Sequence, residues 1–221
     1  ESTRLDPPDA APDHPADLRQ RFRQLLRDRD GRAPVNGRLR MLEKTPKNAL
    51  RIPLLRAVFP EARFIFLYRD PREVLASMME AWESGRFRTY PNLRGWAGKR
   101  PWSLLLTPGW RDLAPLPLNE LVAAQWAAAM QVLLDDLAAV PAERWTVARY
   151  DALLADPNGE IRRLCAAMDL QWDRDLGALP LSRHTVSAPS EDKWRGREPE
   201  LGPVLPRIAE LADRAAETAR R

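Results

Sequence analysis

The sequence has very little of the chemistry that disulfides and metal sites need. Its 221 residues include one cysteine, Cys165, and two histidines, His14 and His184. A single cysteine excludes an internal disulfide, and three such residues do not make the clusters typical of zinc sites. We therefore expect no metal cofactor, and a reducing, cytoplasmic environment.

Long apolar runs are also missing. No stretch approaches about 18 apolar residues, so no transmembrane helix and no membrane partner are predicted. The first residues, Glu-Ser-Thr-Arg, do not resemble a signal peptide. The length suits a single α/β domain. We expect residues 1–221 to form that domain, with 1–37 as an irregular and helical lead-in and 38–214 as the core.

Lysine is scarce although the chain is basic. The net charge is +4, and four of the 35 basic residues are lysines, so arginine supplies nearly all the positive charge. Arginine binds phosphate and sulfate oxygens through two N–H groups at once, which favours an anionic partner. Codon bias is the competing explanation, because alanine and proline are abundant as well.

Strand and helix patterns alternate along the chain. Residues 63–68, Arg-Phe-Ile-Phe-Leu-Tyr, predict a central buried parallel strand, and 38–42 and 145–150 predict two further strands. Apolar residues at helical spacing predict helices over 16–29, 46–59, 71–82, 118–139, 157–168 and 199–219. Such alternation predicts an α/β fold in which helices flank a parallel sheet.

Polar residues follow three of these strands, at 43–48, 69–77 and 150–151. Ligands of open α/β sheets bind at the carboxyl ends of the strands. Arg69 would lie beside the first turn of the next helix, whose free N–H groups favour an anion, and Ser77 lies two turns further on. A helix cap with a local ion pair is the simpler alternative for the same residues.

The blocks carrying these clusters resemble one family. They read Glu-Lys-Thr-Pro-Lys-Asn at 43–48, Phe-Pro-Glu-Ala-Arg-Phe-Ile-Phe-Leu-Tyr-Arg-Asp-Pro-Arg-Glu-Val-Leu-Ala-Ser at 59–77, Gln-Trp at 125–126, Arg-Tyr-Asp-Ala-Leu-Leu-Ala-Asp-Pro at 149–157, and Thr-Val-Ser-Ala-Pro-Ser-Glu-Asp-Lys-Trp-Arg at 185–195. In this order they resemble the sulfotransferases that use 3′-phosphoadenosine-5′-phosphosulfate (PAPS), and most closely a bacterial branch related to tyrosylprotein and heparan N-sulfotransferases. The likeness spans about residues 38–214.

The resemblance implies a P-loop-NTPase-like parallel sheet and transfer of a sulfuryl group from PAPS to a hydroxyl or amine, with no metal. Arg69 and Ser77 would bind the 3′-phosphate of the nucleotide, and Tyr150 would lie near it. The late loop over the cofactor would contain Lys193, Trp194 and Arg195. The simpler alternatives are a core tyrosine at 150 and solvated charges at 193 and 195.

The family also implies a catalytic pair. Glu43 would be the base that takes the acceptor's proton, and Lys44 would stabilise charge on the transferring group. Some family members use a histidine just after this lysine, but Thr45 and Pro46 stand there. The resemblance places Thr185 or Ser187 near the reacting group. A salt-bridged pair at a strand end is the alternative for 43–44.

The family's glycine-rich phosphate loop has no counterpart in this sequence, because no glycine precedes Gly31. Another chain or segment would supply that loop, the sequence would be truncated, or the protein would be an inactive remnant or scaffold. A basic nucleic-acid-binding module is a further alternative, but the aromatic residues mostly follow helical core spacing. We expect a small-molecule acceptor and no nucleic acid, with the Trp- and Arg-rich residues 82–110 as a wall suited to an aromatic or anionic acceptor.

Overall fold

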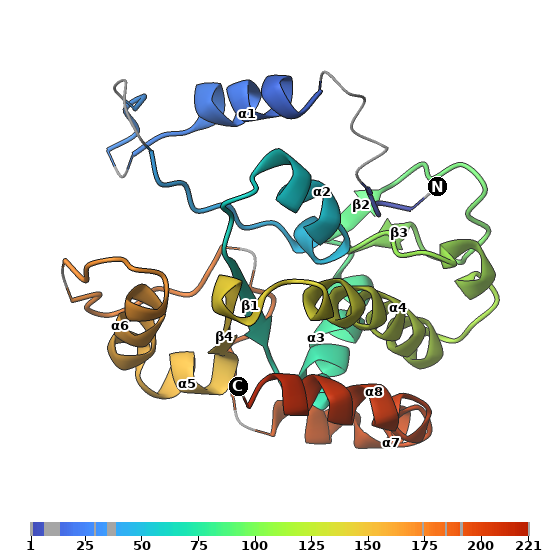
Figure 1. The fold of residues 1–221 in the computed structure, drawn as a ribbon. Coiled ribbons are helices and arrows are strands. Elements are labelled where there is room, and N and C mark those ends of the chain that lie inside the picture. Colours follow the sequence, from blue (N-terminus) through green and yellow to red (C-terminus); the bar gives the residue numbers. More distant parts are fainter. Residues whose placement is uncertain are drawn as a thin grey trace.

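The computed structural model describes residues 2–6, 14–28, 30–34, 39–173, 175–183, 185–190 and 192–220. Helices predominate over strands in it, and the figure labels follow the chain (Figure 1). The elements are α1 (His14–Leu25), η2 (Pro46–Leu50), α2 (Ile52–Val58), β1 (Phe64–Tyr68), α3 (Pro71–Ser84), β2 (Arg88–Tyr90), β3 (Trp102–Ser103), η3 (Trp110–Leu113), α4 (Leu118–Ala138), η4 (Ala142–Arg144), β4 (Trp145–Arg149), α5 (Tyr150–Ala155), α6 (Pro157–Ala167), η5 (Lys193–Arg197), α7 (Glu198–Leu201) and α8 (Leu205–Thr218). None of the helices in these ranges combines the length and the apolar character that crossing a bilayer requires.

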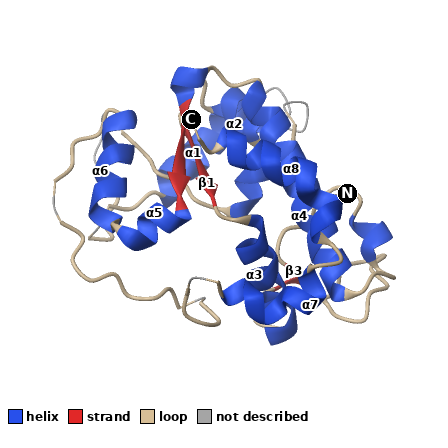
Figure 2. Cartoon of the chain, turned by 90° about the horizontal axis from the view of Figure 1, so that it is seen from below, coloured by secondary structure: helices blue, strands red, loops and turns tan. Residues whose placement is uncertain are grey.

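A parallel pair of strands lies at the centre of the fold. β1 and β4 pair in register from Phe64 opposite Trp145 to Tyr68 opposite Arg149. Their shared apolar face packs against α2, α4 and α8, while α5 and α6 lie on the other side (Figures 1 and 2). The α/β class with helices around a parallel sheet is therefore confirmed, and it is consistent with the P-loop-like fold of sulfotransferases.

The prediction of a central buried parallel strand at 63–68 is confirmed for the strand, which begins at Phe64, and for its parallel pairing, but the strand is buried on one face only. Phe66 is buried, but Ile65 and Leu67 on the opposite face are 39% and 51% exposed. Within the described ranges β1 pairs with β4 alone. The strand expected at 38–42 does not form over 39–42, and residue 38 lies outside the described residues. Leu42 is 84% exposed, because no layer of the described structure covers it.

Side chains from α6 bind the backbone of β4. The Arg149 N–H donates to Glu160 at 3.0 Å, and the Arg163 guanidinium donates to the Val147 carbonyl. Residues 147 and 149 point their backbone groups to the same edge of the strand, because these directions alternate along it. The carboxyl group of Glu160 on α6 is buried, and its ion pair with Arg163 lowers its pKa. This edge of β4 is therefore closed to a further strand.

Caps and prolines explain where the helices begin and end. The Asp70 side chain accepts from the Arg72 N–H at 2.8 Å, Pro71 occupies the first helical position, and α3 ends at Gly85 with a φ of 65°. These features are the expected start and stop signals of a helix. The helix expected over 46–59 is divided at Arg51, between η2 and α2, because Pro53 at the start of α2 has no N–H to continue the preceding turn.

Residues 83–117, which lie between two predicted helices and in which the sequence predicted no strand, contain a short antiparallel hairpin. β2 and β3 pair through Arg88 with Ser103 and Tyr90 with Trp102. Four tryptophan rings pack under it, with centroids 4.8 to 6.4 Å apart. Those rings are Trp82, Trp96, Trp102 and Trp110. They belong to the same core as α3, α4, α7 and α8, so the hairpin rests on a packed base.

Candidate active site

Arg69 and Tyr150 come together at the carboxyl end of the sheet. Arg69 directly follows β1 and Tyr150 directly follows β4, and parallel pairing places both strand ends at one edge. The Arg69 guanidinium lies 4.6 Å from the centre of the Tyr150 ring, a cation–π contact. Its Nη2 also pairs with Glu73 at 3.0 Å. Arg69 and Tyr150 are 81 positions apart in the sequence, and the structure brings them together in one site.

The Arg69 side chain has a buried hydrogen-bond donor without a partner in the described structure. That donor is its Nε–H group. A buried N–H without an acceptor costs about 1–3 kcal/mol, so such a group needs an explanation. Phosphate and sulfate oxygens are the acceptors that an arginine fork binds best. The residues at this strand end therefore fit an anion.

Ser77 extends this site along α3. Glu73 and Ser77 are four residues apart in α3, so they share one face of the helix, and Glu73 pairs with Arg69, which precedes the helix. Ser77 is half-buried, and no hydrogen bond to its hydroxyl occurs within the described structure. Glu73 was not singled out from the sequence. Its spacing from Arg69 was the signal that marks it as the carboxylate that orients the guanidinium.

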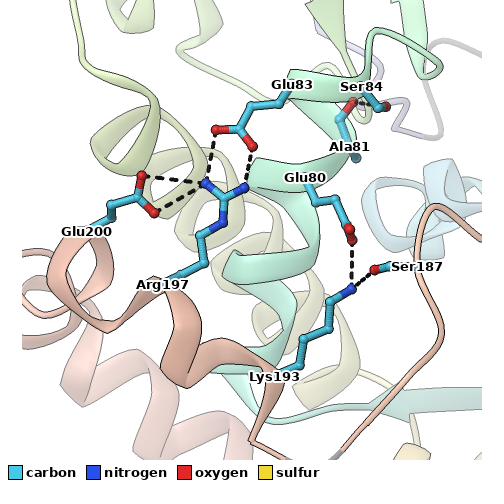
Figure 3. Close-up of polar contacts among 8 residues, drawn as sticks. All are labelled: Glu80, Ala81, Glu83, Ser84, Ser187, Lys193, Arg197 and Glu200. Atoms are coloured by element: carbon cyan, nitrogen blue, oxygen red, sulfur yellow. Dashed lines mark hydrogen bonds and ion pairs between the residues drawn. The ribbon is translucent and has the colours of Figure 1, made fainter.

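The segment that contains Ser187, Lys193 and Arg197, which we call the late segment, is connected to the second half of α3 by ion pairs (Figure 3). The Lys193 ammonium lies 2.8 Å from a Glu80 carboxylate oxygen and also donates to the Ser187 hydroxyl. Arg197 binds Glu83 through both terminal nitrogens. The structure therefore brings Lys193 and Ser187 together, and it gives Lys193 a counter-charge from α3 that the sequence did not indicate.

The remaining residues of the late segment differ in burial. Trp194 is 7% exposed and packs in the core of α3 and α4, with the Arg72 guanidinium 4.6 Å from its ring. Arg195 is exposed and pairs with Asp192 at 3.1 Å. Thr185 is half-buried, and its N–H donates to the Ser182 carbonyl at 2.8 Å. The neighbouring His184, an alternative base, lies outside the described residues.

Glu43 and Lys44 are exposed in the irregular segment before η2. Glu43 accepts a hydrogen bond from the Asn48 amide. Since residues 39–42 form no strand, the prediction that this cluster follows a strand end is wrong. Within the described residues, no hydrogen bond or ion pair connects Glu43 or Lys44 with Arg69.

Side-chain contacts nonetheless fix where residues 39–48 lie relative to the sheet and the hairpin. Arg40 donates to the Met168 carbonyl and Arg63 to the Ala167 carbonyl, both at 3.3 Å. Both arginines therefore bind backbone carbonyls at the turn that ends α6, next to the amino end of β1. Further along, the Lys47 ammonium lies 5.5 Å from the Tyr90 ring of β2. The segment thus runs from the sheet to the hairpin.

Comparison with protein families gives a match that covers most of the chain. The sulfotransferase family model matches residues 4–174, which include the segment at 43–48, Arg69, Ser77 and Tyr150. Neither the curated proteins nor the solved structures yielded a match. In the described part of the chain, no group of three or more His, Cys, Asp or Glu residues is placed to hold a metal ion. The chain belongs to the sulfotransferase family.

Proposed function

We propose that this protein transfers a sulfuryl group from PAPS to a hydroxyl or amine acceptor. The unpartnered, buried Nε of Arg69 is the observation that carries the proposal, because it marks an anion site at the carboxyl end of the sheet. Arg69 and Ser77 would hold the 3′-phosphate there. The Tyr150 ring lies against the guanidinium and the Glu73 carboxylate binds its Nη2, and both contacts orient it.

The donor substrate carries its sulfuryl group on a phosphate, which is the leaving group of the transfer. The chain's own contribution is to bind and orient the substrates and to move one proton. Glu43, which is exposed, would accept the proton of the acceptor hydroxyl or amine as the new bond to sulfur forms. Lys44 would stabilise negative charge on the transferring group and on the departing phosphate. The Glu43–Asn48 hydrogen bond holds the carboxylate in place before the reaction.

The late segment would cover the nucleotide. The buried Trp194 anchors it in the core, and the ion pair between Lys193 and Glu80 fixes it to α3. In this arrangement Lys193 positions the Ser187 hydroxyl, and Ser187 or Thr185 would contact the reacting group. Arg195, exposed beside Trp194, pairs with Asp192 through Nε, and its terminal nitrogens would donate to a phosphate oxygen.

The test of the anion site is a binding measurement on two arginine variants. Arg69→Gln should weaken binding of adenosine 3′,5′-bisphosphate at least about tenfold, since one charged, two-pronged contact is lost. Arg162→Gln is the matched control. Arg162 also pairs with an acid, Asp175, and lies 5.9 Å from a ring, Trp172, but on α6. Equal affinities of the two variants would refute the assignment of the 3′-phosphate site.

The catalytic assignment has its own test. In turnover assays with PAPS, Glu43→Gln and Lys44→Ala should each lower kcat by about 10²-fold or more. Both variants should bind adenosine 3′,5′-bisphosphate like the unmodified protein, because the 3′-phosphate contacts lie elsewhere. Wild-type turnover in Glu43→Gln would show that another group is the base.

A further inference from the structure

The positive charge of this protein is concentrated in one segment. Residues 85–111 carry six basic side chains and no carboxylate, whereas the whole chain has a net charge of +4. The rest of the chain therefore carries more negative than positive charge. All six basic residues are exposed, and they are Arg86, Arg88, Arg94, Lys99, Arg100 and Arg111. We call them the hairpin cations, because they lie in or beside β2 and β3.

None of the hairpin cations forms an ion pair with the described part of the chain. Many arginines elsewhere in the chain do form ion pairs with carboxylates, among them Arg69, Arg149, Arg163 and Arg197. Arg86 instead donates to a backbone carbonyl of residue 183. Glu83 interacts electrostatically with Arg100, but none of the six charges has an ion-pair partner among the described residues, and like charges repel one another, which destabilises the folded segment. An anionic ligand would remove that repulsion.

Two of the hairpin cations line a small cavity. Arg88 and Arg100 border a space of about 140 Å³ whose wall also includes Trp82, Gly85 and Ser103. The Arg88 guanidinium lies directly against Gly85, because a Cβ on that residue would be 2.9 Å from Arg88 Nη2. The cavity accommodates several water molecules, and hence one carboxylate or sulfate group.

The one carboxylate at this cavity is already neutralised. Glu83 belongs to the wall, and Arg197 binds it with both terminal nitrogens and lowers its pKa. The guanidiniums of Arg88 and Arg100 therefore give the cavity a net positive charge. Arginine suits planar carboxylates and tetrahedral sulfates better than lysine does, because its donors form a fixed fork.

The base of the hairpin makes this a rigid site. Trp82 and Trp102 are almost fully buried beneath it, and Gln125 bonds both the Trp82 indole and the Ser103 carbonyl. Burial also removes these rings as stacking surfaces for nucleic-acid bases, so the basic charge does not indicate single-stranded nucleic acid. Lys47 contacts Tyr90 of β2, which places the hairpin next to the segment containing Glu43.

We propose that the acceptor of this sulfotransferase is itself an anion, and that the cavity between Arg88 and Arg100 binds one of its carboxylate or sulfate groups. The other hairpin cations attract the acceptor electrostatically and favour its approach along β2 to the segment at 43–48. This inference rests on the proposed function, because it names the acceptor class of that reaction.

The test uses three phenols that differ in charge: 4-hydroxybenzoate, 4-hydroxybenzenesulfonate and the neutral methyl 4-hydroxybenzoate. Each is titrated into the nucleotide-free protein, and the dissociation constant is read from the NMR signals of the tryptophan indole N–H groups. We expect both anions to bind at least about tenfold more tightly than the ester. The stronger of the two anions identifies whether carboxylate or sulfate is the preferred group.

The double variant Arg88→Gln/Arg100→Gln should bind all three phenols equally. Arg21→Gln/Arg27→Gln, which removes two exposed charges on and just after α1, should keep the preference for the anions. Equal binding of ester and anions to the wild-type protein would overturn the inference, as would an unchanged preference in the first double variant. A dT12 oligonucleotide that binds while the phenols show no charge preference would overturn it in favour of nucleic acid. The Arg88→Gln/Arg100→Gln variant leaves Arg69 unchanged, so anion binding at the Arg69 site would persist in that variant and is thereby distinguished from binding between Arg88 and Arg100.

Discussion

Gln125 is the residue whose replacement tests the packing beneath the hairpin. It lies in α4 and is 1% exposed. Its Oε1 accepts from the Trp82 indole at 3.1 Å, and its Nε2 donates to the carbonyls of Ser103 at 3.1 Å and Leu105 at 2.6 Å. One side chain therefore connects α3, α4 and the chain leaving β3.

Gln125→Met keeps the length of the side chain and removes all three hydrogen bonds. The indole N–H of Trp82 would have no acceptor, at a cost of about 1–3 kcal/mol, and each of the other two bonds contributes about 1 kcal/mol. We expect the free energy of unfolding to fall by about 3–5 kcal/mol. For a domain of this size, each kcal/mol corresponds to about 2–4 °C, so the Tm should fall by about 6–20 °C.

The assay is thermal and urea unfolding followed by circular dichroism and tryptophan fluorescence. Gln131→Met is the matched control, because it changes the same residue type on the same helix, where the exposed side chain bonds to Asp135 alone. The control should stay within about 0.5 kcal/mol of the wild type. A loss below about 1 kcal/mol in Gln125→Met would show that these three hydrogen bonds do not hold the hairpin.

Two further predictions concern the edge of the sheet and the late segment. Pairing with Arg163 lowers the pKa of Glu160, so its stabilising contribution is present above the ordinary carboxyl pKa of about 4.3 and is lost as the pH falls towards the lower folded-state value. Urea unfolding should therefore show that the free energy of unfolding falls more in the wild type than in Glu160→Gln when the pH is lowered from about 5 to about 3. Equal falls in the two proteins would refute this. Glu80→Gln removes the partner of Lys193, and because the pair is partly exposed the cost should be about 1 kcal/mol. Hydrogen exchange at 185–190 should become faster in that variant, and unchanged exchange would mean that the ion pair does not hold the segment.

Local signals in the sequence predicted much of the fold. The Asp70-Pro71 start of α3, its apolar stripe with Leu75 and Trp82, and the long α4 all follow from helix capping and 3.6-residue periodicity. The parallel sense of the sheet followed from the alternation of strands and helices, although the pairing of β1 with β4 joins residues 81 positions apart. The helices depend on residues close together in the chain, which is why they were predictable.

Features that depend on distant partners were not predictable from the sequence. The exposure of Ile65 and Leu67 depends on which layers cover the sheet, and an apolar strand reads the same whether one face or both are covered. Arg69 and Tyr150 were expected at the same edge of the sheet, but their direct contact was not predicted. Glu80 as the partner of Lys193, 113 residues away, likewise had no local signal. The hairpin was missed because its strands are two and three residues long.

The central claim is that the carboxyl end of β1 binds the 3′-phosphate of an adenine nucleotide. The most direct test compares the thermal stabilisation of the wild-type protein by adenosine 3′,5′-bisphosphate and by AMP, which lacks the 3′-phosphate. A ligand at 100 times its dissociation constant stabilises the folded state by about 2.7 kcal/mol. We predict a clear stabilisation by adenosine 3′,5′-bisphosphate at concentrations where AMP has little effect. Equal stabilisation by the two nucleotides would contradict the assignment of Arg69 and Ser77.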